Sequence, residues 1–424
     1  MRIRTSLMAD GAEMSYGSWF DTPCDTVAHM FSLRRSLSML FVGLVLATPA
    51  GAADMTPGDL LIYRVGDGSA SLVKTGNPVF LDEYSQSGTL VASFAVPTTP
   101  SGANHSLFAS GTATSEGMLT LSADGRYVSF TGYESLSAGA GSLASSLAAD
   151  NNRVVGLIDA HGNIDTTTAL SDFADGNNPR SAVTSDGTDI WVSGAAGGVR
   201  YTTLGASTSV QLSSSISNSA QVNIFDGQLY MTSNKNPARG LNALGSGLPT
   251  TSGQSYASLV TSTTTDTFDS FFLANLNNSP GPDTLYLCDE SQGILKYSLI
   301  GNTWTAEGSQ GIVGDIYRGL VGLVEDGGVQ LFSTRDGGSG AFGGGELVSI
   351  TDTSGFGGTM DGSFTVLADA DLGTAFRGVS FVPVATVPEP SFALRFAASV
   401  MSICLFPIKR RRSPRPARPH CRSC

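Results

Sequence analysis

The sequence predicts an all-β fold, a β-propeller of six or seven blades, and two observations carry this prediction. Only 14 % of the 424 residues are charged, while 51 are glycine, which is typical of short strands joined by tight turns and not of helices with charged faces. A motif also recurs along the chain: Asp-Gly or Pro-Asp, then a short aliphatic and aromatic strand, then a small polar residue. Recurring units of this kind indicate a repeat architecture.

Five copies of the motif are clear. They begin at Ala123 (ADGRYVSFTGY), Ser185 (SDGTDIWVSG), Phe225 (FDGQLYMTSN), Gly281 (GPDTLYLCDES) and Glu325 (EDGGVQLFSTR). Their aspartates lie about 50 residues apart on average, the length of one four-stranded propeller blade. Asp-Gly readily adopts the positive φ of a hairpin turn, so each copy is expected to form an antiparallel hairpin. A body of residues 53–386 then holds six or seven blades.

Two further features agree with a ring. Arg-Gly or Arg-Ser pairs recur ahead of strands in PRSAVTSDG, YRGLVGLVEDG and FRGVSFVPV, and the hairpin LYLCDESQGILKYSL resembles those of secreted propellers with NHL-like or lactonase-like blades. The first strand, from Leu60, is expected to pair with the last, from Val379, because that pairing closes the ring and removes both exposed sheet edges. A tandem of β-sandwiches and a parallel β-helix are the alternatives.

Residues 1–52 are predicted to be an N-terminal extension and a secretory signal. Arg34 and Arg35 precede an apolar stretch that is too short to span a bilayer, and Ala50 and Ala52 supply the small residues of a cleavage site. Translation is expected to start at Met30, since a signal normally begins its chain. A twin-arginine signal is the alternative to an ordinary secretory signal.

Residues 387–412 combine three features in a fixed order: a Pro-Glu-Pro motif, an apolar run and a basic block. The motif consists of Val387, Pro388, Glu389, Pro390 and Ser391, and the block consists of Lys409, Arg410, Arg411 and Arg412. The prolines keep Glu389 out of a helix interior. The cations are expected to stop transfer and to remain in the cytoplasm.

This order resembles the PEP-CTERM sorting signal of Gram-negative bacteria, which is also labelled an ice-binding-protein C-terminal motif. The resemblance implies that an exosortase, a membrane-embedded processing enzyme, removes the tail while the inner membrane holds it transiently. The protein is then expected at the cell surface or in the extracellular matrix. Residues 413–424 form a further basic tail that departs from the pattern, and a nucleic-acid-binding tail is the rival interpretation.

The body is strongly acidic. Residues 53–386 contain 31 acidic and 12 basic residues, a net charge of −19, which disfavours nucleic acid and anionic lipid as partners. No cofactor is expected, with scattered calcium binding as the minor alternative. Cys288 is the only cysteine of the body, so no internal disulfide is expected, and its apolar strand predicts a buried hydrophobic role.

No residue of the body is assigned a catalytic, cofactor-binding or metal-binding role from the sequence. The G-x-G-x-x-G at Gly338, Gly340 and Gly343 is followed by a strand-like segment, which predicts a hairpin loop and not a nucleotide site. His105 and His161 are expected at the surface, because no set of three or four zinc ligands accompanies them.

Acidic and aromatic residues are the remaining candidates. Three acidic groups are interpreted as solvated loop charges: Asp82 with Glu83, Asp289 with Glu290, and Asp369 with Asp371. Glycosidase chemistry needs two carboxylates about 5–10 Å apart in a pocket, a distance that sequence does not show. Trp191 is expected in the core, and Trp304 is the exposed candidate for stacking on a sugar ring.

These observations favour an exported, surface-sorted propeller without catalytic activity, a binding or structural component of the cell envelope or matrix with extracellular polysaccharide as a partner. The alternative is a secreted propeller hydrolase or lyase that acts on a polysaccharide or a lactone. Carboxylates that converge on the central channel favour the enzyme. An apolar or Ser/Thr-lined channel favours the binding protein.

Overall fold

The computed structural model describes residues 54–137, 141–262, 266–312, 314–336 and 343–385. Within these residues the fold is almost entirely β, and the 3-10 turn η1 (Leu143–Ser145) is the only helical element. The strands form six sheets, so the predicted all-β propeller is confirmed, with six blades. The predicted signal peptide and the C-terminal sorting segment lie outside the described residues.

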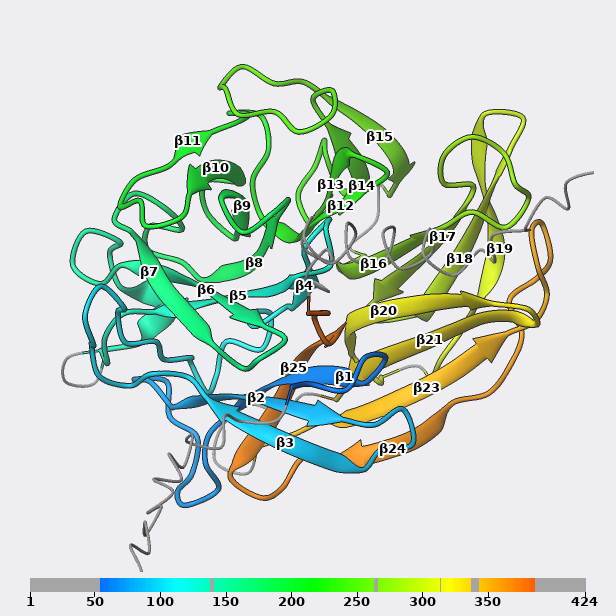
Figure 1. Ribbon diagram of the computed structural model, residues 1–424. Coiled ribbons are helices and arrows are strands. Elements are labelled where there is room, and N and C mark those ends of the chain that lie inside the picture. Colours follow the sequence, from blue (N-terminus) through cyan, green and yellow to red (C-terminus); the bar gives the residue numbers. More distant parts are fainter. Residues whose placement is uncertain (1–53, 138–140, 263–265, 313, 337–342, 386–424) are drawn as a thin grey trace, which may run out of the picture. The chain divides into compact units, whose positions relative to one another are not determined.

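Blades 2 to 6 are antiparallel sheets of four strands in chain order (Figure 1). Blade 2 contains β4 (Thr120–Leu121), β5 (Tyr127–Tyr133), β6 (Arg153–Asp159) and β7 (Ile164–Leu170). Blade 3 contains β8 (Pro179–Thr184), β9 (Asp189–Gly194), β10 (Val199–Thr203) and β11 (Val210–Gln211). Blade 4 contains β12 (Ser219–Phe225), β13 (Gln228–Ser233), β14 (Gly240–Leu244) and β15 (Tyr256–Thr261).

Blade 5 contains β16 (Phe268–Ala274), β17 (Thr284–Asp289), β18 (Gly293–Ile300) and β19 (Thr303–Gln310). Blade 6 contains β20 (Tyr317–Glu325), β21 (Gly328–Arg335), β23 (Glu346–Asp352) and β24 (Thr365–Asp369). Blade 1 combines both ends of the body: β25 (Thr374–Phe381), β1 (Leu60–Val65), β2 (Val79–Tyr84), β3 (Leu90–Ala95) and the two-residue β22 (Gly343–Gly344).

Blade 1 closes the ring. Strand β25 pairs antiparallel with β1, with Leu60 opposite Phe381, so the predicted pairing of the first and last strands is confirmed. Strand β25 also contacts β20 of blade 6 and β4 of blade 2. It thereby completes a ring of six inner strands: β4, β8, β12, β16, β20 and β25. Closure pairs the first and the last strand of the body, β1 and β25, with each other, so neither is left as a free sheet edge.

The aspartates of the sequence repeat occupy one structural position. Each lies between the inner strand of a blade and the strand next to it: Asp124, Asp186, Asp226, Asp283 and Asp326. Asp226 and Gly227 have φ values of 47° and 70°, the two positive values of a type I′ hairpin turn. Asp283 instead accepts hydrogen bonds from the backbone N–H groups of Leu276 and Asn277, both at 2.9 Å, and closes a longer loop. The repeat in the sequence therefore follows the blades.

The hydrophobic core consists of six clusters, each between two adjacent blades. Strand β1 shows the arrangement: Leu61, Tyr63 and Val65 belong to the cluster with blade 2, whereas Leu60 and Ile62 belong to the cluster with blade 6. Because both faces of the sheet are covered, such a strand is a continuous apolar run and not an alternation of apolar and polar residues.

Two expectations about single features are confirmed. Trp191 is 1 % exposed and lies between blades 3 and 4, and Cys288 is fully buried between blades 5 and 6. Most of the glycine-rich segment, residues 337–342, lies outside the described part, and the glycines that follow, Gly343 and Gly344, pair with β25 of blade 1. None of the helical structure in the described ranges is long and apolar enough to cross a membrane.

Candidate active site

The inner strands share an irregularity near their N-terminal ends. In β8 and β20 an extra residue interrupts the pairing with the next strand, Arg180 and Arg318 respectively. Strand β25 has Arg377 at the same place, and β16 has Asp269. A β-bulge of this kind turns a side chain out of the regular alternation between the two faces of a sheet. Side chains at the bulges can therefore face the channel instead of the core between blades.

Glycine accompanies these side chains where the inner strands approach each other. Arg377 precedes Gly378 in β25, and Glu116 precedes Gly117 just ahead of β4. A Cβ atom on Gly378 would lie 2.4 Å from the carbonyl oxygen of Gly117, so a side chain does not fit at that position. In each Arg-Gly pair the arginine thus supplies a charged side chain, and the glycine allows the backbones of neighbouring inner strands to approach closely.

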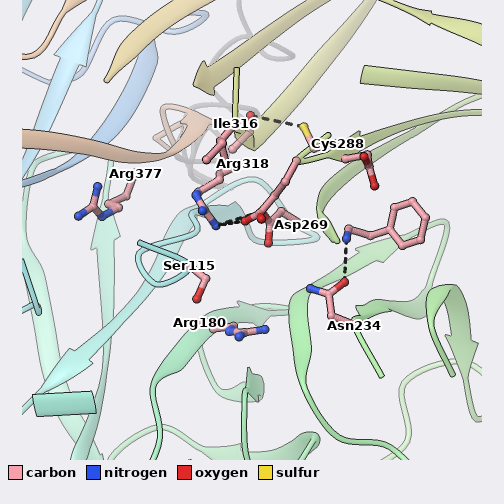
Figure 2. A network of polar contacts seen from close by, with 12 residues as sticks. Ser115, Arg180, Asn234, Asp269, Cys288, Ile316, Arg318 and Arg377 are labelled. Atoms are coloured by element: carbon pink, nitrogen blue, oxygen red, sulfur yellow. Dashed lines mark hydrogen bonds and ion pairs between the residues drawn. The ribbon is translucent and has the colours of Figure 1, made fainter. Parts of the chain in front are cut away.

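A polar cavity of about 290 Å³ lies at this end of the channel. Its charged lining consists of Arg180, Arg239, Arg318, Asp269 and Glu290, and its neutral lining includes Ser115 and Asn234. Figure 2 shows Ser115, Arg180, Asn234, Asp269 and Arg318 gathered from different strands and loops. Blades 2 to 6 all contribute to this lining, so the cavity depends on the closed ring.

Arg318 holds the two carboxylates of the cavity. Its Nη1 atom lies 2.6 Å from Oε1 of Glu290 and 3.3 Å from Oδ2 of Asp269. Asp269 is fully buried, whereas the Glu290 side chain is 27 % exposed. Oδ1 of Asp269 has no hydrogen-bond partner within the described ranges. One cation therefore joins a buried carboxyl group to a solvent-accessible one.

The environment of Asp269 suits proton transfer near neutral pH. Burial raises the pKa of Asp269 to about 7; the charge of Arg318 opposes this shift, and the negative charge of Glu290 adds to it. Two acidic groups that share one site do not both ionise readily. Asp269 can therefore exchange a proton near pH 7, which is the condition for general acid–base chemistry.

The turn between β17 and β18 positions Glu290. The preceding residue, Asp289, is fully buried, and its Oδ1 accepts hydrogen bonds from the backbone N–H groups of Ser291 and Gln292 at 2.8 and 2.9 Å. The N–H of Glu290 donates to the carbonyl oxygen of Thr267 at 3.0 Å. Asp289 thus shapes the turn, and Glu290 faces the cavity. Their interpretation as solvated loop charges is wrong.

A second buried acid lies next to the cavity. Burial raises the pKa of Glu116 to about 8, against the opposing effect of Arg377. Its carboxylate accepts hydrogen bonds from the hydroxyl of Tyr133, at 3.1 Å, and from the backbone N–H of Ser110. Glu116 follows the cavity residue Ser115 in the chain but does not itself line the cavity.

The interpretation of Asp82 and Glu83 as solvated loop charges is also wrong. Both lie on β2 and are 2 % exposed, because neighbouring structure covers both faces of that strand. Each has a partner, as a buried charge requires: Asp82 forms an ion pair with Arg64, and Glu83 accepts a hydrogen bond from the N–H of Thr56 at 2.7 Å. Neither residue lines the cavity.

The other candidates lie away from the cavity. Asp369 and Asp371 are exposed, and His105 and His161 are partly exposed, as expected. Trp304, on the outermost strand of blade 5, is partly buried against the cluster between blades 4 and 5. Across the described part of the chain, no group of three or more His, Cys, Asp or Glu side chains is placed to hold a metal ion.

Sequence reasoning gave no functional role to the four residues at the centre of this site: Asp269 was not considered, Glu290 was interpreted as a solvated charge, and Arg180 and Arg318 were noted only as parts of a repeat. The recurring Arg-Gly and Arg-Ser pairs are the signal that points to the two arginines. Equivalent positions on the inner strands meet around the axis of a propeller, so a charged residue that recurs at such a position indicates a charged channel. The Arg-Gly and Arg-Ser pairs therefore indicate a sequence repeat and also a charged site in the channel.

No protein-family model matches the chain, and no curated protein matches it. Solved structures do resemble it. The periplasmic gluconolactonase PpgL of Pseudomonas aeruginosa is 11 % identical, with a TM-score of 0.43, over 77 % of this chain and 99 % of its own. A Bacteroides uniformis protein assigned as a 6-phosphogluconolactonase is 13 % identical, with a TM-score of 0.40, over 73 % of this chain and 82 % of its own.

A Synechocystis apocarotenoid oxygenase is 11 % identical, with a TM-score of 0.35, over 78 % of this chain and 94 % of its own. At these identities the likeness concerns the fold. The expectation of a propeller without catalytic activity is nevertheless corrected, because of the residues that line one end of the channel. Carboxylates and arginines converge at this end of the channel, the feature expected of an enzyme, whereas mainly apolar residues of five inner strands line a second pocket in the channel.

Proposed function

We propose that the propeller is a hydrolase that opens a lactone in the polar cavity of its channel. One observation carries the proposal: Asp269 and Glu290 lie around the single cation of Arg318, at 3.3 and 2.6 Å, and burial raises the pKa of Asp269 to about 7. Lactone hydrolysis needs a base for the attacking water and an acid for the departing ring oxygen. A carboxyl pair with one proton can supply both.

The same distances favour a lactone over a glycoside. Glycosidases place their two carboxyl groups on either side of the scissile bond, about 5–10 Å apart. Here both carboxyl groups contact one nitrogen atom of Arg318, so they face a substrate from one side. Attack at a carbonyl carbon is compatible with this arrangement, because water addition and loss of the ring oxygen occur at the same carbon atom.

The proposed reaction has one carbonyl addition and one bond cleavage. The carboxylate of the pair takes a proton from water as the water oxygen bonds to the carbonyl carbon. The bond from that carbon to the ring oxygen then breaks, and the carboxylic acid of the pair protonates the ring oxygen, which yields a hydroxy acid. Asn234 accepts a hydrogen bond from the N–H of Phe268 at 2.7 Å, which leaves its NH₂ group as a donor to the developing oxyanion.

Hydrolysis of sugar lactones by the full chain tests the proposal. Proton release in a pH-stat is expected with 1,4- and 1,5-aldonolactones, and no cleavage is expected with aryl glycosides. The value of kcat/KM is expected to fall above about pH 7, because Asp269 then loses the proton that the ring oxygen needs. Cleavage of glycosides without turnover of any lactone would contradict the proposal.

We also propose that the protein is exported and that an exosortase-type enzyme removes its C-terminal segment. The support is the order of features in the sequence: an N-terminal signal, the tripeptide Pro388-Glu389-Pro390, an apolar run and the cations Lys409 to Arg412. The mature protein would then reside at the cell surface or in the extracellular matrix.

Glu389→Ala is expected to leave the apolar run intact while abolishing recognition, so that uncleaved protein accumulates in the inner membrane. Mass spectrometry of the mature C-terminus measures the outcome. Thr386→Ala, which lies just ahead of the motif and leaves it unchanged, is the control and should be processed normally. A wild-type protein that retains Arg412 and the terminal Cys424 at the cell surface would show that the segment is a permanent anchor.

A further inference from the structure

Two arginines of the cavity have no ion-pair partner among the residues that the structure describes. Arg180 and Arg239 line the cavity together with Arg318, which alone of the three pairs with carboxylates. Arg180 donates one long hydrogen bond, 3.4 Å, to the carbonyl oxygen of Ser219, and Arg239 donates to the carbonyl oxygen of Asp266. In the described ranges, the Nε atoms of both arginines lack a hydrogen-bond partner.

The remaining internal segments contain no acid that could neutralise these charges. Residues 138–140, 263–265, 313 and 337–342 include neither Asp nor Glu. Desolvation of a cation is unfavourable: burial lowers the pKa of Arg180, although the charges of Asp269 and Glu290 oppose this shift. An anion bound in the cavity would offset this cost. The guanidinium group suits an oxyanion, since its planar donors match a carboxylate or phosphate.

We propose that the substrate of this cavity carries a carboxylate, which Arg180 and Arg239 bind while the lactone carbonyl faces Asp269 and Glu290. This inference rests on the proposed lactone hydrolysis and names its substrate class, the lactones of sugar diacids. Arg180 comes from blade 3 and Arg239 from blade 4, whereas the carboxyl pair comes from blade 5. The two ends of one substrate would therefore contact different blades.

The charge and the size of the cavity both favour a singly charged sugar. The positive charge of the three arginines exceeds the negative charge of Glu290 and the partly protonated Asp269 by one to two units. A substrate with one carboxylate therefore brings the net charge of the cavity close to zero. A volume of about 290 Å³ lies at the lower limit of ligand pockets, which span about 300–1,000 Å³. It accommodates one sugar ring and not an extended chain.

Binding of two matched sugars by the full chain tests the inference independently of catalysis. Methyl glucuronoside and methyl glucoside differ only in a carboxylate and a hydroxymethyl group. By titration calorimetry, the uronoside is expected to bind about 10- to 100-fold more tightly, the effect of one or two charge-assisted hydrogen bonds. Arg180→Gln and Arg239→Gln, tested separately, should each reduce this preference.

Arg126→Gln is the matched control, because Arg126 lies in the turn after β4 and pairs with Asp124 at the surface; it should leave the preference intact. Equal binding of the two sugars, or a preference that survives both cavity substitutions, would overturn the inference. Tighter binding of methyl glucoside 6-phosphate than of the uronoside would also overturn it, in favour of a phosphate. Arginine-dependent uronoside binding without lactone turnover would refute the hydrolase and retain the carboxylate site.

Discussion

Asp269→Asn is expected to lower kcat/KM for lactone hydrolysis by about 10²- to 10⁴-fold, the usual contribution of a general acid–base group. Asparagine has nearly the same size as aspartate and keeps a hydrogen-bonding carbonyl oxygen, but it does not exchange a proton at neutral pH. Arg318 retains its ion pair with Glu290 at 2.6 Å, so the rest of the cavity keeps its contacts. Initial rates between pH 6 and 8 measure the effect.

Thermal unfolding separates this catalytic role from a structural one. Because burial raises the folded-state pKa of Asp269 to about 7, its favourable contribution to stability is complete below about pH 4, the unfolded value. That contribution is lost as the pH rises through 7. Asp269→Asn should therefore melt at or above the wild-type temperature at pH 8.

The exposed Asp369 supplies the matched control, and Asp369→Asn should change neither the rate nor the melting temperature. Wild-type activity in Asp269→Asn would remove Asp269 from the reaction. A reduced rate accompanied by a lower melting temperature at pH 8 would assign Asp269 to the fold instead of the chemistry.

Lys296→Met is expected to destabilise the fold by about 3–5 kcal/mol, the effect of removing one partner from a buried ion pair. Nζ of Lys296 lies 2.7 Å from Oδ2 of Asp352, and both side chains are fully buried. Lys296 also donates to Oγ of Ser354 and to the carbonyl oxygen of Gly355 at 2.6 and 2.7 Å. The pair joins β18 of blade 5 to the end of β23 in blade 6. Urea unfolding followed by circular dichroism measures the loss.

The pH dependence of this pair has a defined sign. Burial alone would raise the pKa of Asp352, but hydrogen bonds from Lys296, Ser354 and Tyr286 outweigh it and hold the pKa at about 2. The stability that Asp352 contributes is therefore complete above about pH 4, the unfolded value, and is lost as the pH falls toward 2. Lys296→Met should weaken this acid sensitivity.

Two controls accompany Lys296→Met. The double variant Lys296→Met with Asp352→Leu removes both charges and should be more stable than Lys296→Met alone, because no uncompensated buried charge remains. Arg126→Met breaks the exposed pair with Asp124 and should change the unfolding midpoint little, since exposed ion pairs contribute little. A small effect of Lys296→Met, equal to that of Arg126→Met, would contradict a structural role for the buried pair.

The blades were predictable because their signals are local. Asp226 and Gly227 adopt the positive φ values that the Asp-Gly pair favours, and Trp191 lies in the core that its apolar strand predicts. The ring closure by the strands that contain Leu60 and Val379 was also predictable, because one general requirement, the removal of free strand edges, selects it. Each of these inferences needs only neighbouring residues or a rule that applies to every propeller.

The carboxylates show where such local reasoning ends. Asp82, Asp289 and Asp369 each precede a second acidic residue by one or two positions, yet Asp82 and Asp289 are buried and Asp369 is exposed. Burial depends on which blade covers the strand or turn, and this follows from the number of blades and their packing. A carboxylate interpreted without that information is assigned to solvent, which is correct only for Asp369.

The sequence by itself determined the chain's strand periodicity, its hairpin turns and the repeating Arg-Gly and Arg-Ser positions, because backbone preferences and apolar patterning act over a few residues. Only the tertiary structure decided that Arg180, Asp269, Glu290 and Arg318 share one cavity. These residues span 139 positions of the chain. Arg180, Asp269 and Arg318 meet because the bulges of the inner strands turn side chains toward the axis of a closed ring, and the turn between β17 and β18 adds Glu290. The pKa of Asp269 follows from the same closure, since the blades around it exclude water and bring Glu290 and Arg318 into contact with it.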